Sequence, residues 1–299
     1  MSPSAPFADR LAALVEERRS QICLGLDPDP LKLGPEGEAA AAGADAPAAV
    51  RAGSAVSAHC RALIERAGPA CVAVKPQLAC FERLGAPGLM ALAEVRDAAR
   101  DAGLLFVADG KRGDVPVTAT AYGQALVGET PTPWGSVAGL GADAFTANPL
   151  LGADALEPLV EAAADVGAGV FALVRTSNPG AADLQDLPAP ERPLHERLAA
   201  LVEGFAERLV GRTGLSGMGA VVGATEPHHL ARLRELMPRS IFLIPGVGAQ
   251  GGRPEELGAA FAPGPASGLV AASRGIAADP DPAAAAERLR SAVWEAATA

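Results

Sequence analysis

Short, uninterrupted runs of apolar residues recur along the whole chain, and each run ends in a polar or Gly/Pro-rich cluster. Runs of this kind are typical of parallel strands buried on both faces, whereas half-buried strands alternate apolar and polar positions. The predicted strands are Ile22–Leu26, Cys71–Val74, Leu104–Ala108, Ala144–Thr146, Gly169–Val174, Met218–Val222, Ile241–Ile244 and Gly268–Ala272.

Amphipathic stretches separate these runs and predict helices. The predicted helices are Phe7–Arg19, Ser54–Arg66, Gly88–Ala102, Leu156–Val166, Leu194–Arg212, His228–Met237, Glu255–Phe261 and Pro282–Thr298. Strands that alternate with helices over 299 residues predict an α/β fold, a single (β/α)8 TIM barrel that forms one domain over residues 1–299. The main alternative is a doubly wound open sheet, whose first strand would lead into a glycine-rich phosphate fingerprint, but Asp-Pro-Asp-Pro stands at 27–30.

Two segments fall outside this alternation. Residues 33–47 (LGPEGEAAAAGADAP) show no apolar periodicity, so we expect a mobile surface excursion there. Residues 180–193 are rich in proline and acidic residues and follow a predicted strand, which makes them a candidate active-site loop.

Composition narrows the class of protein. The net charge of -10 disfavours contact with phosphate backbones, so general nucleic-acid binding is not expected. No run of about 20 uncharged apolar residues is present, so we expect no membrane span. The first ten residues, MSPSAPFADR, lack the basic and apolar regions of a signal peptide, and we expect a cytoplasmic protein.

The cysteines and histidines predict no metal site. Cys23, Cys60, Cys71 and Cys80 form no CxxC pair, and in a chain of this length we expect reduced thiols, three of them in apolar surroundings. Among the histidines on predicted helices, we expect surface or capping roles rather than catalysis for three. They are His195, His228 and His229.

Lysine is rare among the basic residues of this chain. Only Lys32, Lys75 and Lys111 are lysines among 25 basic residues. A lysine retained against a strong arginine bias indicates a need for a compact, titratable ammonium group, which arginine does not supply. Lys75 and Lys111 each follow a predicted strand, where barrel enzymes place their chemistry, whereas Lys32 lies in a loop and is expected on the surface.

The densest charge cluster, Asp109–Asp114 (DGKRGD), follows the third predicted strand. Side chains two residues apart on extended chain point to the same side, so the carboxylate of Asp109 and the ammonium of Lys111 are expected to meet. Nearby acids hold such an ammonium in its charged form. The alternative is a purely structural ion-pair network.

The last two strand ends have the composition of an anion site. Gly246, Gly248, Gly251 and Gly252 allow close approach of backbone N–H groups to an oxyanion, and Arg274 adds a guanidinium suited to phosphate. Barrels often bind phosphate after their seventh and eighth strands. The alternative is that these glycines only form turns.

These motifs together resemble the orotidine 5'-phosphate decarboxylase family, in the type 2 subgroup with a DxKRGD signature. The resemblance extends almost from end to end. It rests on FADRL at Phe7, LGLDP at Leu24, VAVKPQ at Val72, DGKRGDV at Asp109, TANPLLG at Thr146, TSNPGA at Thr176, VVGATEP at Val221, PGVGAQGG at Pro245 and SRGI at Ser273.

The resemblance implies catalytic roles by matched position. Lys111 corresponds to the lysine that protonates C6 of the pyrimidine, and Asp109 to its charged partner beside the departing carboxylate. Asp114 corresponds to an aspartate that the family supplies across a dimer interface, and Thr118 to a partner-chain residue near the ribose. A homodimer with shared active sites is therefore implied.

The same comparison implies how the substrate is held. Asp27 and Lys75 correspond to ligands of the ribose hydroxyls, and Ser177 to the serine that reads the pyrimidine. Gln250 and Arg274 correspond to the phosphate grip, with Gln250 on a loop that closes over the substrate. The implied reaction converts orotidine 5'-phosphate to uridine 5'-phosphate and CO2, the last step of de novo pyrimidine nucleotide synthesis, without a cofactor or a metal.

Two other functions stay open at this level. A Mg²⁺-dependent phosphosugar decarboxylase or aldolase of the same suprafamily would place an acid at the end of the second strand, where Lys75 stands and would repel the ion. A non-catalytic phosphate-binding barrel would be expected to lack Lys111 or one of the aspartates.

Overall fold

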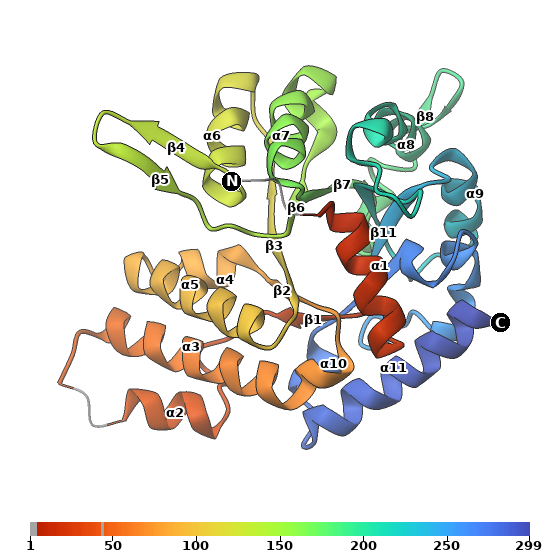
Figure 1. Cartoon of the computed structure of the whole chain (residues 1–299). Coiled ribbons are helices and arrows are strands. Elements are labelled where there is room, and N and C mark those ends of the chain that lie inside the picture. Colours follow the sequence, from red (N-terminus) through yellow and green to blue (C-terminus); the bar gives the residue numbers. More distant parts are fainter. Residues whose placement is uncertain (1–4, 43–44) are drawn as a thin grey trace.

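The computed structural model of the chain describes residues 5–42 and 45–299. Its centre is a closed, parallel barrel with the strand order β1-β12-β11-β10-β7-β6-β3-β2 (Figure 1). The barrel strands are β1 (Ile22–Leu26), β2 (Ala73–Pro76), β3 (Leu105–Arg112), β6 (Ala144–Ala147), β7 (Gly169–Arg175), β10 (Ser216–Val222), β11 (Ser240–Pro245) and β12 (Gly268–Ala272). All the apolar runs predicted as strands are thus barrel strands, and the predicted (β/α)8 TIM barrel is confirmed.

The barrel closes where β1 pairs with β12, through Ile22 opposite Val270. Because side chains alternate in direction along each strand, the core has two parts. One part fills the barrel interior and includes Val107, Phe171 and Leu243. The other lies between the strands and the surrounding helices. Interior positions near the strand ends therefore point toward a common mouth.

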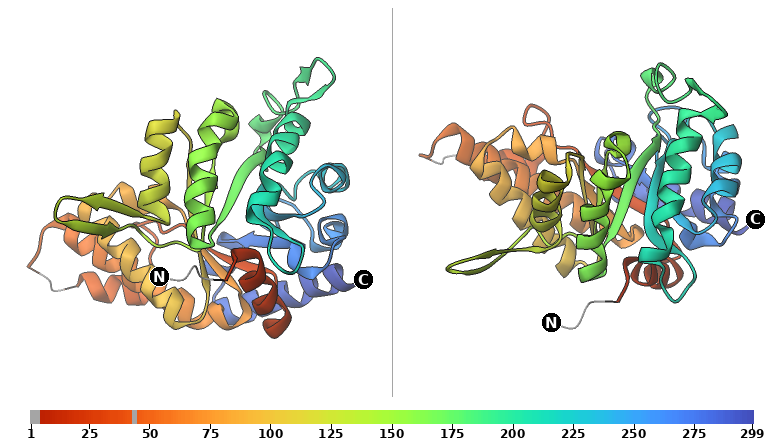
Figure 2. Two further views of the ribbon diagram at one scale, coloured as in Figure 1. Left: turned by 45° about the horizontal axis from the view of Figure 1, so that its top comes forward. Right: turned by 90° about the horizontal axis from the view of Figure 1, so that it is seen from above.

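Helices surround the barrel, as both views in Figure 2 show. The longer ones are α1 (Phe7–Arg18), α3 (Ala48–Ala67), α5 (Ala86–Asp101), α6 (Pro116–Leu126), α7 (Ala153–Val166), α8 (Leu194–Phe205), α9 (His228–Leu236) and α11 (Pro282–Thr298). The short ones are α2 (Pro35–Ala41), α4 (Leu78–Glu82) and α10 (Arg274–Ala277). Within the described ranges, no helix has the length and apolar character needed to cross a membrane.

Helix α1 closes the amino-terminal mouth of the barrel. Its residues Phe7, Leu11 and Val15 are buried in the interior cluster. The ring of Phe7 packs edge-on against that of Phe171, with 5.8 Å between the ring centroids. Since these side chains fill the barrel interior at this end, the polar residues that follow the strands lie at the other end, the carboxyl ends of the strands.

Several helix predictions need correction. Glu255–Phe261 forms two 3-10 turns, Pro254–Glu256 and Gly258–Phe261, and the helix predicted to reach Arg212 ends at Phe205 with a 3-10 turn after it. The helix at Pro116–Leu126 was not predicted, and Val, Thr and Gly in that segment are weak helix formers. There, Pro116 occupies the first helical turn, which its fixed φ favours.

Two excursions leave the barrel. The strands β4 (Glu129–Thr132) and β5 (Gly135–Ala138), which the sequence analysis did not predict, form an antiparallel hairpin that projects from the side of the molecule (Figures 1 and 2). Segment 33–47 contains α2, while residues 43–44 lie outside the described residues. The mobility of that segment stays a prediction.

Candidate active site

The carboxylate of Asp109 is the centre of a polar cluster at the open mouth of the barrel. Nζ of Lys75 donates to Oδ2 at 2.5 Å, and Nζ of Lys111 donates to Oδ1 at 2.6 Å. The hydroxyl of Thr146 also donates to Oδ1, at 2.9 Å. Three neighbouring strands, β2, β3 and β6, supply these residues, so the barrel itself fixes their positions.

The charges of this cluster stabilise one another in a nearly dry environment. Burial alone would raise the pKa of Asp109, but the two lysines outweigh it and lower the pKa to about 2. Burial alone would lower the pKa of Lys75, but the carboxylates of Asp109 and Asp27 outweigh it and raise the pKa above its ordinary value. The carboxylate is therefore ionised and the Lys75 ammonium charged at neutral pH.

Lys111 differs from Lys75 in its exposure and its backbone. Its side chain is 41% exposed, against 11% for Lys75, so its ammonium is reachable from the mouth of the barrel. Its φ is 48°, in the left-handed region that non-glycine residues seldom adopt. The backbone N–H of Lys111 donates to Oγ1 of Thr146 at 2.8 Å, which holds this conformation. Strain of this kind concentrates at functional sites.

A cavity of about 380 Å³ opens beside the ammonium group of Lys111. One wall is apolar and comes from Leu173, Val221 and Leu243. Polar lining comes from the loop after β7, which includes the predicted base-reading residue Ser177. A flat, partly polar ring is the kind of ligand that such a cavity accommodates.

A second cavity continues from the first, because Lys75 and Pro245 line both. It is lined by Asp27, Gln250 and Arg274, as the sequence analysis predicted for the ribose and phosphate ligands. Among the described residues, the guanidinium of Arg274 has no ion-pair partner and is exposed. A free guanidinium at the far end of the cavity is suited to an anionic group.

The glycine-rich loop after β11 differs in detail from the expectation. The N–H groups of Gly248, Gly251 and Gly252 donate within the loop, to the carbonyls of Gly252, Gly248 and Gly246 at 2.8–3.0 Å. These amides are therefore not free to bind an anion in this conformation. Positive φ values at Gly246, Gly248 and Gly251 let the loop turn back on itself.

Asp114 and Thr118 lie apart from these cavities. Neither lines a cavity that holds Lys111, and Oδ1 of Asp114 accepts the N–H of Val115 at 2.7 Å. The residues next to them in the chain include exposed apolar side chains, among them Val117, which is 85% exposed. Leu150 and Leu151 are also exposed. They follow Asn148, whose backbone N–H donates to the carbonyl of Arg112, so they lie near this position.

Other predicted side-chain environments are mostly confirmed. Lys32 lies at the surface, and Cys23, Cys60 and Cys71 are buried thiols, with free Cys80 half-buried. Burial raises the pKa of Cys23 to about 12, so this thiol is not reactive. The prediction for His195 is wrong, because its residue exposure is only 4%.

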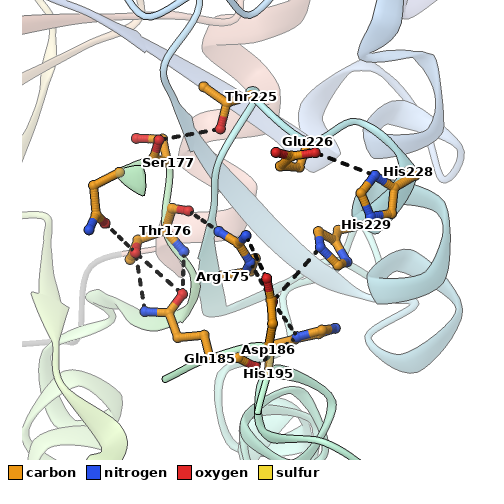
Figure 3. Close-up of polar contacts among 11 residues, drawn as sticks. Arg175, Thr176, Ser177, Gln185, Asp186, His195, Thr225, Glu226, His228 and His229 are labelled. Atoms are coloured by element: carbon orange, nitrogen blue, oxygen red, sulfur yellow. Dashed lines mark hydrogen bonds and ion pairs between the residues drawn. The ribbon is translucent and has the colours of Figure 1, made fainter. Parts of the chain in front are cut away.

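His195 belongs to a cluster behind the loop that carries Ser177 (Figure 3). His195, His229 and Asp186 bring one ligand-type atom each to within 4.8 Å of one another, and in the described ranges no other group meets this spacing. Burial, with the nearby charges of His228, His195 and Arg175, lowers the pKa of His229 to about 4. The cluster is separate from the contacts of Lys111.

Comparison with known proteins shows the family of this chain. A sequence model of the orotidine 5'-phosphate decarboxylase / HUMPS family matches residues 20–289. The chain belongs to this family. Orotidine 5'-phosphate decarboxylase of Rhodopirellula baltica is 40% identical over 282 residues, which cover 90% of this chain and 87% of the relative. The Deinococcus radiodurans enzyme of the same name is 40% identical over 276 residues, which cover 92% and 90%.

Solved structures of the family show the same barrel. The OMP decarboxylase of Leishmania donovani has a TM-score of 0.75 and 33% sequence identity, and the match covers 98% of this chain and 100% of that one. The chain therefore shares the overall fold of this family.

The sequence analysis missed three polar residues of the site. Thr146 contacts Asp109 and Lys111, Gln77 donates to Asp109 at 3.4 Å, and Gln185 lines the larger cavity. The sequence carried a weak signal for Thr146. Side chains two positions apart on a strand point to the same side, so the Thr146 hydroxyl faces the barrel interior as Ala144 does. Gln185 lies within the segment 180–193 that was expected to form an active-site loop.

Proposed function

We propose that this protein decarboxylates orotidine 5'-phosphate to uridine 5'-phosphate and CO2, in de novo pyrimidine nucleotide synthesis. The observation that carries the proposal is the ammonium of Lys111, held 2.6 Å from Asp109 at the edge of a cavity suited to a base. Membership of the family supports the same reaction. A cytoplasmic location stays a prediction of the sequence.

The proposed role of Lys111 is to stabilise and then protonate the carbon that loses CO2. When the C6–carboxylate bond breaks, its electron pair stays on C6 as a carbanion without an adjacent π-acceptor, and CO2 leaves. The Lys111 ammonium stabilises this charge, donates a proton to C6, and regains one from water. Two charges about 4 Å apart interact by roughly 4 kcal/mol at an effective dielectric near 20, so one contact supplies only part of the barrier reduction.

The remaining stabilisation is proposed to come from substrate groups far from C6. Asp27 and Lys75 would bind the ribose hydroxyls, Ser177 the pyrimidine, and Gln250 and Arg274 the phosphate. Supporting this assignment, the two adjoining cavities run from Lys111 to Arg274 along the mouth of the barrel. Binding energy from a remote phosphate serves catalysis when it orders and closes the site around the reacting carbon.

The active form is proposed to be a homodimer in which Asp114 and Thr118 complete the partner's site. Two observations support this: neither residue lines the cavities beside Lys111, and each is next in the chain to an exposed valine. Val115 and Val117 are 56% and 85% exposed. Contiguous exposed apolar side chains of this kind are typical of a surface that another protein covers.

The decisive experiment is the loss of ultraviolet absorbance when purified protein is mixed with orotidine 5'-phosphate. We expect turnover by the wild type that survives excess chelator, and turnover that requires Mg²⁺ would instead favour the phosphosugar enzymes. Lys111→Ala is expected to abolish turnover while the protein stays folded. Retention of more than a few per cent of the wild-type rate would contradict the assigned role.

Shared sites are tested by mixing two inactive variants, Lys111→Ala and Asp114→Ala. Subunits that exchange at random form hybrid dimers in which one of the two sites is intact, so we expect activity to return to about a quarter of the wild-type level. If the mixture remains as inactive as its components although an affinity tag on one variant co-purifies the other, Asp114 does not act across an interface.

A further inference from the structure

The loop Thr176–Asn178 after β7 carries Ser177, and its first residue is hydrogen-bonded to the side chain of Gln185 (Figure 3). Oε1 of Gln185 accepts the backbone N–H of Thr176 at 2.8 Å. Nε2 of the same side chain donates to Oγ1 of Thr176 at 3.1 Å. One amide group therefore fixes both the backbone and the side chain of the residue directly before Ser177.

A second support reaches the same loop through a buried arginine. Nη1 of Arg175 donates to the carbonyl of Thr176 at 2.7 Å, and its Nε and Nη2 atoms bind the two oxygens of Asp186 at 2.8 and 2.9 Å. The Arg175 side chain is only 8% exposed. Its hydrogen bonds hold the pKa of Asp186 below the ordinary value. A buried guanidinium needs such an anion, because an unpaired buried charge is costly.

The segment that carries Gln185 and Asp186 is itself anchored to a rigid helix. At the start of α8, the backbone N–H of His195 donates to the carbonyl of Gln185 at 2.9 Å. Nδ1 of the buried His195 ring lies 2.9 Å from the same carbonyl and 3.2 Å from Oδ1 of Asp186. The barrel strand, the base-contacting loop and α8 thus form one hydrogen-bonded unit.

We infer that Gln185 and Asp186 are positioning residues that hold Ser177 against the pyrimidine and thereby determine recognition of the base. The inference rests on the proposed function, since it takes the larger cavity as the base site. Neither residue needs to touch the reacting carbon. They act through Thr176 and Arg175, the two residues that precede Ser177 in the chain.

A divalent metal ion is the other possible occupant of this cluster, but the donor atoms fit it poorly. Both oxygens of Asp186 are bound by Arg175, so an ion there would lie beside a guanidinium. The carbonyl of Gln185 only accepts hydrogen bonds, so Nδ1 of His195 carries the proton and offers no lone pair. The contacts favour a positioning unit over a metal site.

The test compares ligands with and without a base, using Asp186→Asn and Gln185→Met. Calorimetry should show affinity for uridine 5'-phosphate reduced about tenfold or more, with affinity for ribose 5-phosphate unchanged. The matched control is Glu196→Gln, because Glu196 on α8 also binds an arginine through both carboxylate oxygens. Nε and Nη2 of Arg232 on α9 donate to these oxygens at 3.0 Å each. The control should change neither affinity.

Three outcomes would overturn the inference: unchanged affinity for both ligands, equal loss for both, or stoichiometric Zn²⁺ binding by the wild type that Asp186→Asn abolishes. The last outcome would assign the cluster to a metal. The binding measurements do not depend on turnover, so they are separate from the test of the proposed function. If the wild type fails to decarboxylate orotidine 5'-phosphate, that function fails whatever the variants bind.

Discussion

Thr146 and Lys111 are joined by a hydrogen bond in which Oγ1 of Thr146 accepts the backbone N–H of Lys111 at 2.8 Å. The same hydroxyl donates its proton to Oδ1 of Asp109 at 2.9 Å. One side chain on β6 therefore fixes the unusual backbone of Lys111 and the carboxylate that its ammonium contacts. The position of the proposed proton donor depends on this hydroxyl.

Replacing Thr146 by valine is expected to lower kcat about ten- to a hundredfold, because the isosteric side chain keeps the shape and loses both hydrogen bonds. Steady-state kinetics with orotidine 5'-phosphate measure the effect. Thr146→Ser keeps the hydroxyl and should retain most of the activity. Activity that is kept in the valine variant and lost in the serine variant would show that the methyl group, not the hydroxyl, matters.

Asp109 should make the protein sensitive to acid. Its pKa is about 2 in the folded protein against 3.8 ordinarily, so the folded state favours the ionised form by about 2 kcal/mol. For a lowered carboxylate pKa, this stabilisation is present above about pH 4 and is lost as the pH falls toward 2. Urea unfolding at several pH values should show Asp109→Asn less stable at neutral pH, with the difference shrinking over that range.

The control for the acid series is Asp97→Asn, because the side chain of Asp97 is 59% exposed and pairs with Arg96, its neighbour in the chain. Exposed pairs contribute little to stability, so this variant should follow the wild type across the whole pH range. A stability difference for Asp109→Asn that stays constant down to pH 2 would contradict the lowered pKa.

Gly223 should be required for the position of Ser177. A Cβ atom on Gly223 would lie 2.7 Å from Cα and 2.9 Å from N of Ser177. A Cβ atom does not approach backbone atoms of another residue this closely. Gly223→Ala must therefore displace the loop, and we expect affinity for uridine 5'-phosphate, measured by calorimetry, to fall at least about tenfold. Gly204→Ala is the matched control, since a Cβ there has open space. Wild-type affinity in Gly223→Ala would show that the loop adapts freely.

Arg274 should bind the phosphate group. We expect Arg274→Ala to weaken uridine 5'-phosphate binding about ten- to a hundredfold and to leave uridine binding unchanged, because only the nucleotide carries the charge. Arg253→Ala is a suitable control, since Arg253 lies on the neighbouring loop and pairs with Glu256. Equal losses for nucleotide and nucleoside would count against a phosphate grip.

The sequence by itself determined the barrel and the chemistry at its mouth. Each barrel strand is an apolar run long enough to recognise without its partners, and polar residues such as Lys75 and Asp109 follow the runs directly. Because parallel strands all end at the same rim, their order along the chain is enough to predict that these residues meet. For that reason the apolar runs in the sequence predict correctly which polar residues meet in the folded barrel.

Only the tertiary structure decided how that rim is supported. The supporting residues lie 35 or more positions from Lys111 in the chain: Thr146, Gln185 and His195. Gln185 also belongs to a loop whose path no periodicity predicts. His195 on an amphipathic helix gives no sign of whether it faces solvent or a neighbouring carbonyl. Hydrogen bonds between distant segments depend on the packed positions of both partners, and apolar periodicity carries no information about such pairs.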